Sequence, residues 1–207
     1  QEKLKEFLEK IGILGQLNFD IKEIGKPLSF KWRECKLKTV SYGHGITTTP
    51  IQLAKGYAIL ANGGFDINPT LIKKKINNIK KKRILKKDVS SKLNKIFRKV
   101  VTQGTATLSD VEGYEVGGKT GTAQIVENGN YTKKKINTFA SVFPSSDPKY
   151  VLVILLEDTK LSKDYVYKYR NKPGSYKGTP FNTAGWTSVE ITGKILDKIG
   201  PILATKY

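Results

Sequence analysis

The stretch GGKTGTAQ, residues 117–124, gathers the residue types in this chain that could do chemistry. One cation, Lys119, stands beside the hydroxyls of Thr120 and Thr122, with the bare backbone of Gly121 between them. On a β-strand alternate side chains point to opposite faces, so the two threonines would share one face and the lysine would take the other. If the strand borders a cleft, the glycine lets a substrate backbone approach closely, and the strand edge can hydrogen-bond an extended peptide.

This set of groups suits acyl transfer on a peptide with a free carboxylate. The lysine supplies positive potential, the threonine hydroxyls can hold the carboxylate, and a main-chain N–H can face a developing oxyanion. A strand with exposed polar residues also explains the Lys-Thr-Gly triplet, because short lysine-containing strings arise by chance in a chain with 37 basic residues. On the triplet alone the second interpretation is the better one, so the flanking sequence has to decide.

The composition limits the kind of protein and the kind of site. With 207 residues, 38% of them hydrophobic, the chain can form one well-buried domain. Its single cysteine, Cys35, excludes an internal disulfide, and the sequence has no cysteine–histidine cluster that could hold a structural metal. His44 is the only histidine, so any serine–histidine or cysteine–histidine catalytic pair would depend on it alone.

The formal net charge of +19 comes almost entirely from lysine, since the only arginines are Arg33, Arg83, Arg98 and Arg170. A nucleic-acid-binding protein would favour arginine for bidentate contacts to bases and phosphates. We interpret the lysines as a solvated surface, with attraction to an anionic membrane surface or polymer as the alternative.

Apolar spacing predicts four helices, with a loop-rich stretch over residues 16–38. The first spans residues 2–13. The second, over 47–64, has Thr48 or Thr49 as its cap, Pro50 at its first position and Asn-Gly-Gly at its end. The third, over 88–101, has Asp88 or Ser90 as its cap and turns four apolar side chains inward: Leu93, Ile96, Phe97 and Val100. The closing helix ends near Gly200 and carries Val189, Ile191, Ile195, Leu196 and Ile199.

Three strands are predicted, over residues 114–126, 137–144 and 149–158, and the third is apolar enough to be central in a sheet. Alternation in the lysine-rich stretches 70–76 and 80–87 predicts a short hairpin or edge strands. Helices, then a run of strands, then a helix imply a largely antiparallel sheet covered by helices.

The longer stretch VTQGTATLSDVEGYEVGGKTGTAQ, residues 101–124, resembles the segment around the third active-site motif of the penicillin-binding transpeptidases, above all the class B enzymes of septal and elongation wall synthesis. SYGHGITTTPIQLAKGYAILANGG, residues 41–64, resembles another of their segments over its whole length. Residues 138–160 resemble the strand–turn–strand that follows the motif, and the likeness runs in order from about Lys3 to Ile199.

The resemblance implies a fold and a reaction. The fold is the α/β (α+β connectivity) helix–sheet–helix sandwich shared with serine β-lactamases, with a mostly antiparallel sheet, here incomplete. In that family the serine of an S-x-x-K motif attacks the D-Ala-D-Ala carbonyl of a peptidoglycan stem peptide, and D-alanine leaves. The acyl group then passes to an amine of a neighbouring stem peptide, with no cofactor.

Roles for particular residues also follow from the resemblance. Lys119 would join the charge network around the serine. Thr120 and Thr122 would bind the terminal carboxylate of the donor peptide or of a β-lactam, and the N–H of Thr122 would be one oxyanion donor. Tyr42 and His44 would line the same cleft, although a partly exposed loop histidine without a catalytic role explains His44 equally well.

The sequence departs from the family pattern in two places that bear on the site. Asn182 and Thr183 stand where many relatives carry aromatic residues, which puts the pocket shape on that side in doubt. Val189 stands where relatives often have proline.

Two motifs of the family have no counterpart here. The only S-x-x-K match begins at Ser146, in a turn after the Lys-Thr-Gly strand, whereas the family's serine opens a buried helix well before that strand. No S-x-N triplet occurs, and the chain opens on Gln1 and contains no methionine. We therefore expect residues 1–207 to be the C-terminal part of one transpeptidase domain, with its start upstream, and to be inactive alone.

The expected partners are stem peptides ending in D-Ala-D-Ala, β-lactams, and membrane proteins of the divisome or elongasome, but no nucleic acid. The resemblance also implies a protein anchored in the inner membrane by an N-terminal helix that is not in this chain, with this domain in the periplasm or otherwise outside the cytoplasmic membrane. Two alternatives remain: a β-lactam-sensing or β-lactam-hydrolysing relative, against which residues 41–64 argue, and a basic module that binds nucleic acid or another anionic polymer. The second leaves residues 117–124 unexplained and predicts an affinity that collapses with salt.

Overall fold

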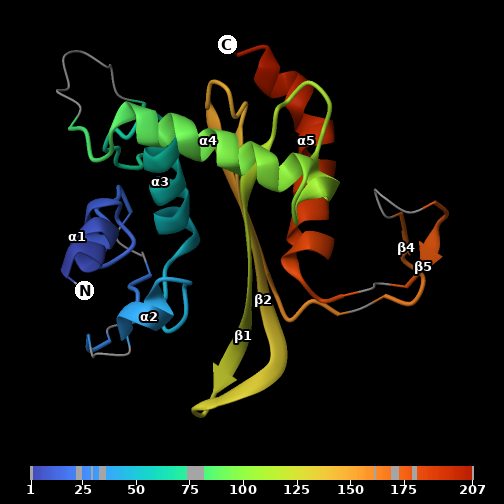
Figure 1. The fold of residues 1–207 in the computed structure, drawn as a ribbon, viewed down its shortest axis with the longest axis horizontal. Coiled ribbons are helices and arrows are strands. Elements are labelled where there is room, and N and C mark those ends of the chain that lie inside the picture. The colour runs from blue at the N-terminus through green and yellow to red at the C-terminus, as the bar shows by residue number, and fades with distance from the viewer. Residues whose placement is uncertain are drawn as a thin grey trace. The chain divides into compact units, whose positions relative to one another are not determined.

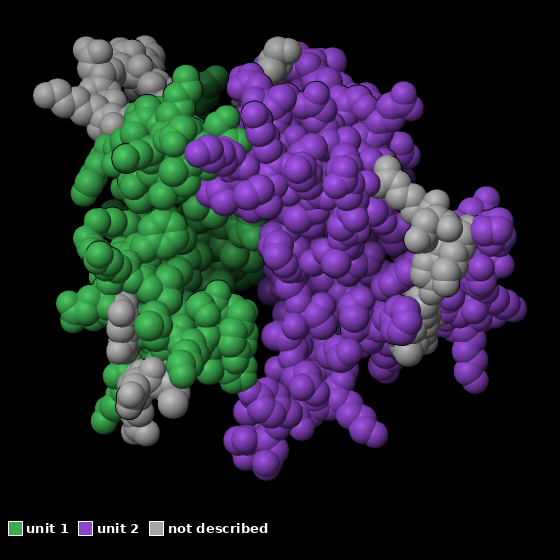
Figure 2. Space-filling view, viewed as in Figure 1, with its two compact units in different colours: residues 1–91 green, residues 92–207 purple. Residues whose placement is uncertain are grey.

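The computed structural model describes residues 2–21, 25–28, 30–32, 36–73, 82–160, 162–168, 173–178 and 181–206. The chain divides into two compact units, residues 1–91 and 92–207, coloured green and purple in Figure 2. The single domain expected over residues 1–207 stays a prediction.

The first unit is helical. It contains α1 (Glu2–Lys10), α2 (Lys36–Val40), α3 (Pro50–Ala61) and the first residues of α4 (Lys87–Thr102), all visible in Figure 1. The helix α2 lies in a stretch expected to be loop-rich, and its five residues form little more than one turn, too short for apolar spacing to reveal.

The start of α3 follows from its sequence. Thr49 is the N-cap, with Pro50 next to it, and the Thr49 side chain accepts a hydrogen bond from the backbone N–H of Gln52 while the Gln52 side chain bonds the backbone of Thr49. This reciprocal pair is a capping box. Gln52 is buried, and its amide also donates to the carbonyls of Gly12 (3.1 Å) and Gly15 (2.8 Å), which ties the segment after α1 to α3.

The end of α3 is closed by glycines and by a residue of α4. Gly63 and Gly64 both have positive φ, and a Cβ on Gly64 would lie 2.2 Å from the carbonyl oxygen of Leu85. The buried Ser90 donates through its hydroxyl to the carbonyl of Leu60 (2.6 Å) and accepts from the N–H of Gly63 (3.0 Å). Ser90 thus binds the end of α3 from inside α4, and its predicted role as the cap of α4 is wrong.

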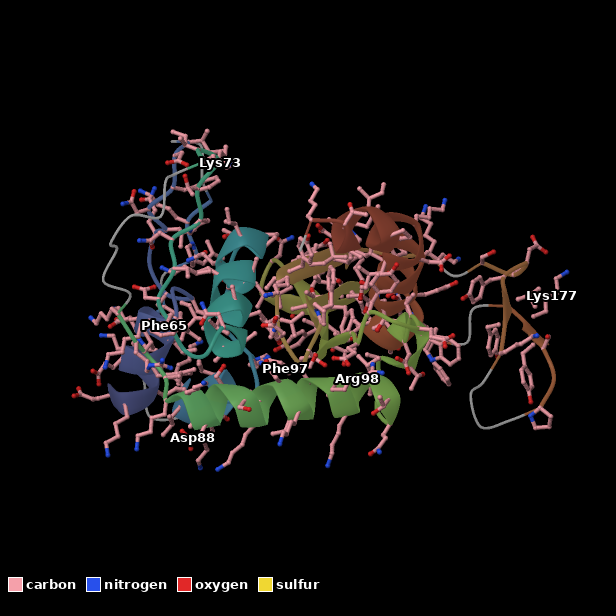
Figure 3. The ribbon with its side chains drawn as sticks, turned by 90° about the horizontal axis from the view of Figure 1, so that it is seen from above. Phe65, Lys73, Asp88, Phe97, Arg98 and Lys177 are labelled. Carbon is pink, nitrogen blue, oxygen red and sulfur yellow. The ribbon has the colours of Figure 1, made fainter. Side chains whose placement is uncertain are left out.

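The other expectations for α4 are corrected in part. The helix begins at Lys87, so Asp88 lies in its first turn and is not its cap. Phe97 is buried as predicted and Val101 is completely buried, whereas Ile96 is 55% exposed, against the prediction. Positions 97 and 101 are one helical turn apart and define the inner face, and position 96 lies beside that face. Figure 3 shows α4 from above with Phe97 and Arg98 labelled.

The predicted lysine-rich hairpin cannot be judged as a whole, because residues 74–81 lie outside the described residues. Among the described residues of these stretches, Arg83 forms an isolated antiparallel bridge with Phe65, and its guanidinium lies 4.0 Å from the centre of the Phe65 ring. At Arg83, the second lysine-rich stretch therefore pairs with Phe65, in the segment that follows α3.

The second unit holds an antiparallel sheet of three strands in the order β1 (Gly117–Glu127), β2 (Asn130–Phe143) and β3 (Tyr150–Glu157). All three predicted strands are confirmed, and so is the antiparallel pairing. The central position is corrected, since β2 lies between its neighbours and β3 pairs with β2 alone among the described strands. In Figure 1 the β1–β2 hairpin, in yellow, extends well beyond the C-terminal helix α5.

The core of the second unit joins the end of α4, β2 and α5 (Ser188–Ala204). Its fully buried members include Val189 and Leu196 of α5, as predicted, while Ile191 and Ile199 remain more than one third exposed. The helix α5 continues four residues past Gly200, with Pro201 inside it. The core cluster consists of Val101, Ala106, Val116, Phe139, Phe143, Val189 and Leu196.

Two short elements of the second unit were not predicted. The strands β4 (Val166–Tyr167) and β5 (Tyr176–Lys177) pair antiparallel. The ring of Tyr167 stacks on Tyr176 with 5.5 Å between centroids and meets the ring of Trp186 edge-on at 5.0 Å. This aromatic contact brings the β4–β5 hairpin to the 3-10 helix η2 (Ala184–Trp186), which precedes α5.

Candidate functional site

The Lys-Thr-Gly triplet lies on β1, and glycine fixes how closely this strand approaches β2. A Cβ on Gly118 would lie 2.4 Å from the carbonyl oxygen of Ala140, so no larger residue fits there without moving a strand. Next along β1, Lys119 is opposite Ala140 and Thr122 is opposite Asn137. Of the described strands, only β2 pairs with β1.

Hydroxyl groups are paired along one side of β1. The Thr120 hydroxyl lies 2.8 Å from the Thr105 hydroxyl, and the backbone N–H of Ala184 donates to the Thr122 hydroxyl oxygen at 3.0 Å. A threonine hydroxyl has one hydrogen to donate besides its acceptor lone pairs. Because Thr122 accepts from Ala184, its own hydrogen remains available to a bound group.

These threonines line a pocket of about 550 Å³ in the second unit. Threonine is the most frequent residue in the wall of the pocket. The wall also contains one tryptophan and one lysine, Lys168. The pocket could hold a small polar group of negative charge, since hydroxyls and a cation converge on it. The lining residues are Thr102, Gln103, Gly104, Thr105, Thr107, Leu108, Thr120, Thr122, Lys168, Thr183, Ala184, Gly185 and Trp186.

Lys119 is separate from this pocket, as the alternation of side chains along a strand predicts. Its side chain is exposed, and its ammonium donates to the backbone carbonyl of Thr120 at 2.8 Å. Lys119 is not among the residues that line the pocket. The triplet therefore presents a cation and a hydroxyl-lined pocket on different sides of the same strand.

Comparison with known proteins identifies the family that carries this arrangement. Residues 1–177 match the family described as the penicillin binding protein transpeptidase domain. The chain belongs to this family. The resemblance stated from the sequence is thereby confirmed.

Individual relatives agree with this family and give the extent of the match. The chain is 27% identical over 219 residues to the probable peptidoglycan D,D-transpeptidase FtsI of Caulobacter vibrioides, a match that covers 99% of this chain and 35% of that protein. It is 30% identical over 175 residues to the stage V sporulation protein D of Bacillus subtilis, a match that covers 77% of this chain and 27% of that protein. The chain thus spans about a third of the length of these curated relatives.

The fold is that of transpeptidase domains. The apo transpeptidase domain of penicillin-binding protein 3 from Burkholderia pseudomallei matches with a TM-score of 0.79 at 22% identity, over 97% of this chain and 57% of that chain. The transpeptidase domain of FtsI4 from Legionella pneumophila matches with a TM-score of 0.62 at 22% identity, over 95% of this chain and 60% of that chain. The predicted fold class, a transpeptidase-like arrangement of helices with an antiparallel sheet, is confirmed.

Tyr42 and His44, which the family resemblance assigned to the cleft, lie in the turn after α2. Tyr42 is 73% exposed, its ring centroid lies 6.1 Å from that of His44, and the His44 backbone N–H donates to the Thr39 carbonyl at 2.9 Å. Both belong to the first compact unit, whereas Thr122 belongs to the second. That they share one cleft with Thr122 stays a prediction.

Ser146 has the surroundings expected of a turn residue. It is exposed, its backbone N–H donates to the Glu115 carboxylate at 3.3 Å, and Lys149 of the same S-x-x-K match forms an ion pair with Asp147 at 2.8 Å. The prediction that Ser146 lies in a solvent-exposed turn is confirmed.

Arg98 is a supporting residue that the sequence analysis did not single out. One of its guanidinium nitrogens donates to the Asp110 carboxylate at 2.8 Å and to the Val116 carbonyl at 2.9 Å (Figure 3 labels Arg98). These bonds fasten the end of α4 to the residue just before β1 and so hold both ends of the loop that carries Thr105. The scarcity of arginine in this lysine-rich chain was a signal that could have identified it.

Thr105 and Ala184 are the pocket residues that the sequence analysis missed. Each contacts a motif threonine through one hydrogen bond. Thr105 lies inside the stretch that resembles the family, but no pattern marks a hydroxyl partner 15 residues away. Ala184 acts through its backbone N–H, a role that its side chain does not reveal.

The described residues contain no group of three or more potential metal ligands, and none of their helices combines the length and apolar character needed to span a bilayer.

Near the pocket, the pKa of Tyr165 is raised above its usual range. Burial is the larger cause, and a hydrogen bond to Glu190 is the second. The phenol of Tyr165 donates this hydrogen bond to the Glu190 carboxylate.

Proposed function

We propose that this chain is part of a peptidoglycan D,D-transpeptidase that cross-links stem peptides through a serine acyl-enzyme and reacts with penicillins. Membership of the transpeptidase family supports the reaction class. The observation that carries the proposal for this chain is the hydroxyl-lined pocket on β1, where Thr120 and Thr122 stand together and the hydrogen of Thr122 remains free to donate.

The proposed reaction has two steps. A serine oxygen attacks the carbonyl of the penultimate D-alanine, the peptide C–N bond breaks, and D-alanine departs with the proton on its amine. An amine of a second stem peptide then attacks the carbonyl carbon of the resulting serine ester, the C–N bond of an amide forms, the ester C–O bond breaks, and the serine oxygen takes the proton that the amine loses. Neither step requires a metal or an organic cofactor.

Thr120 and Thr122 hold the terminal carboxylate of the donor peptide in this proposal. A hydrogen bond from a hydroxyl to a carboxylate is charge-assisted and stronger than one between neutral groups. Gly121 between them adds no side chain, so the substrate backbone can lie along the strand. The backbone N–H of Thr122 is the proposed oxyanion donor from this chain.

Lys119 acts from the other side of β1 through its charge. Its exposed ammonium bonds only the carbonyl of Thr120 among the contacts that the structure gives it, and this local bond is readily exchanged. A cation next to the attacking serine favours loss of the serine proton and stabilises negative charge on the tetrahedral intermediate.

The partners proposed for the whole enzyme are stem peptides ending in D-Ala-D-Ala, β-lactams, and membrane proteins of the divisome or elongasome. The proposed location is outside the cytoplasmic membrane, where peptidoglycan lies. We further propose that the chain alone is not acylated, because its only S-x-x-K match is the exposed turn at Ser146.

Covalent labelling with a fluorescent penicillin tests this function. We expect the full-length gene product that contains this chain to form an adduct on a serine upstream of Gln1, stable to denaturation, and we expect residues 1–207 alone to remain unlabelled. Absence of an adduct on the full-length protein would contradict the transpeptidase proposal. Rapid turnover of the adduct would favour the β-lactam-hydrolysing alternative, and an adduct on Ser146 of the chain alone would contradict the assignment of that serine.

A further inference from the structure

Asn137, Thr159 and Asn182 form a cluster of polar side chains, and Asn182 directly precedes Thr183, which lines the pocket. Asn137 is fully buried on β2, and its amide nitrogen donates to the Thr159 hydroxyl (2.9 Å) and to the Asn182 side-chain oxygen (2.5 Å). The Thr159 hydroxyl donates to the same Asn182 oxygen (3.1 Å), and the Asn182 amide nitrogen donates to the Thr159 carbonyl (2.9 Å). We call these three residues the amide cluster.

The amide cluster joins three segments that are distant in the sequence. Asn137 comes from β2, Thr159 from the segment after β3, and Asn182 from the segment just before η2. Four hydrogen bonds hold these segments together, and each of the three side chains takes part in at least two of them.

The cluster is coupled to the pocket by its position. Asn137 lies opposite Thr122 in the β1–β2 register, and Asn182 is two residues before Ala184, whose N–H donates to the Thr122 hydroxyl. The segment 182–184 is thus fastened at one end to β2 by the amide cluster and at the other end to β1 by Ala184. With both ends fixed, this segment forms one wall of the pocket.

Stability alone does not account for this arrangement. Among the residues that the structure describes, the buried Asn137 side-chain oxygen has no hydrogen-bond partner, and leaving such an acceptor unsatisfied is destabilising. An apolar residue at position 137 would avoid that penalty. Buried polar networks are better suited to fixing one geometry than to adding stability.

We propose that the amide cluster is a positioning device for carboxylate recognition. It holds the Ala184 N–H on the Thr122 oxygen, so the Thr122 hydrogen is directed at the pocket and is ready to bind an anion. Asn137, Thr159 and Asn182 do not touch the substrate and act through Ala184 and Thr122. The role in carboxylate binding rests on the proposed function, whereas the positioning of Ala184 does not.

The first test is independent of catalysis and uses amide hydrogen exchange at Ala184. In the Asn182→Ala and Asn137→Ala variants we expect the Ala184 N–H to exchange about tenfold faster, as the loss of a buried hydrogen bond predicts. Ser141→Ala is the matched control, because Ser141 is also fully buried on β2 and its hydroxyl bonds the Leu152 carbonyl, not the cluster. Unchanged exchange in both cluster variants overturns the proposal.

The second test measures recognition of the carboxylate in the full-length gene product. Its readout is the ratio of the acylation rate constants for benzylpenicillin and for its methyl ester, which lacks the charge. We expect Asn182→Ala to lower this ratio about tenfold, the scale of one charge-assisted hydrogen bond, mainly through the reaction with benzylpenicillin. A merely structural defect would slow both compounds equally, and Ser141→Ala should leave the ratio unchanged.

A double-variant cycle completes the test. Thr122→Val removes the hydroxyl, so adding Asn182→Ala to it should produce no further change in the ratio. Faster exchange at Ala184 with an unchanged ratio, or equal effects of Asn182→Ala with and without the Thr122 hydroxyl, overturns the link to Thr122. If neither compound acylates the parent protein, the proposed function is wrong, and the exchange measurement still decides whether the cluster positions Ala184.

Discussion

In the proposed function the hydroxyls of Thr120 and Thr122 bind an anion, and both hydroxyls are positioned by other residues of the second unit. Each is held by a neighbour from another part of the second unit, Thr105 in one case and the backbone of Ala184 in the other. Such prior positioning lowers the cost of ordering the groups when a ligand binds. At the scale of single residues, the site therefore depends on contacts that do not themselves meet the substrate.

Replacing the Thr122 hydroxyl tests this directly. In the full-length protein, Thr122→Val should slow acylation by benzylpenicillin about tenfold or more, because a hydrogen bond to a charged group is lost. The backbone N–H remains, so the effect should be smaller than that of Lys119→Ala. Thr122→Ser keeps the hydroxyl and should stay within a few-fold of the parent; a Val variant as fast as the Ser variant would exclude the hydroxyl from the reaction.

Arg98 is expected to stabilise the fold through its paired contacts. Arg98→Lys should lower the free energy of unfolding by about 1–3 kcal/mol, because an ammonium on a flexible stem cannot keep the paired contacts to Asp110 and Val116. Urea unfolding monitored by circular dichroism would measure the change. Lys95→Ala, at an exposed position on α4, is the control and should change little; equal effects at both positions would refute the anchoring role of Arg98.

The elements that shape the pocket meet through glycines. On α5, a Cβ at Gly193 would lie 2.4 Å from the carbonyl oxygen of Leu108, which belongs to the 3-10 helix η1 (Thr107–Ser109). A Cβ at Gly200 would lie 2.4 Å from the ring of Tyr114. These contacts set how closely α5 approaches the segment between α4 and β1, which supplies one pocket wall.

Gly193→Ala should therefore destabilise the fold, even though alanine is the better helix former. The gain from helix propensity is at most about 1 kcal/mol, whereas forcing backbone atoms apart in a packed core costs about 1–3 kcal/mol. Thermal unfolding should show a net loss for Gly193→Ala and little change for Lys198→Ala at an exposed position on α5. A more stable Gly193→Ala variant would contradict the close packing of α5 on η1.

The helix α3 gives a prediction about pH. Burial raises the pKa of Tyr57 to about 12, against about 10 for an exposed tyrosine. The folded state holds the phenol proton more tightly than the unfolded state does. The contribution of Tyr57 to the free energy of unfolding is therefore complete below pH 10 and is lost as the pH rises from 10 to 12. Tyr57→Phe should remove this part of the alkaline decline in unfolding free energy, by about 2 kcal/mol at pH 12; parallel pH profiles for the two proteins would contradict the burial of the phenol.

The whole chain shows which features sequence patterns can predict. The capped helix at Thr49, the three strands and the position of the Lys-Thr-Gly triplet on a strand follow from local spacing and turn residues, and the structure confirms them. The amide cluster and the contacts of Thr105 and Ala184 join residues between 15 and 62 positions apart, and no local pattern encodes them. Ile96 and the edge position of β3 were mispredicted because periodicity gives an apolar face but not which neighbour covers it.

At the same scale, charge does not identify the function. The net charge of +19 is compatible with a basic polymer-binding module as well as with an enzyme, whereas membership of the transpeptidase family supports the enzyme. Binding to an anionic polymer would fall steeply with salt, while acylation by a small β-lactam should depend on salt only weakly.

We propose that Lys119 and its strand form part of an acyl-transfer site. The most direct measurement is the second-order rate constant for acylation of the full-length gene product by a fluorescent penicillin, compared between the parent, Lys119→Ala and Lys133→Ala. Lys133 is an exposed lysine on β2 and controls for the loss of one positive charge. We predict a fall of about 100-fold for Lys119→Ala, the scale of losing one group that stabilises developing charge, and a change of less than about twofold for Lys133→Ala. A Lys119→Ala protein that acylates as fast as the parent would contradict the proposed role of Lys119 and its strand in acyl transfer.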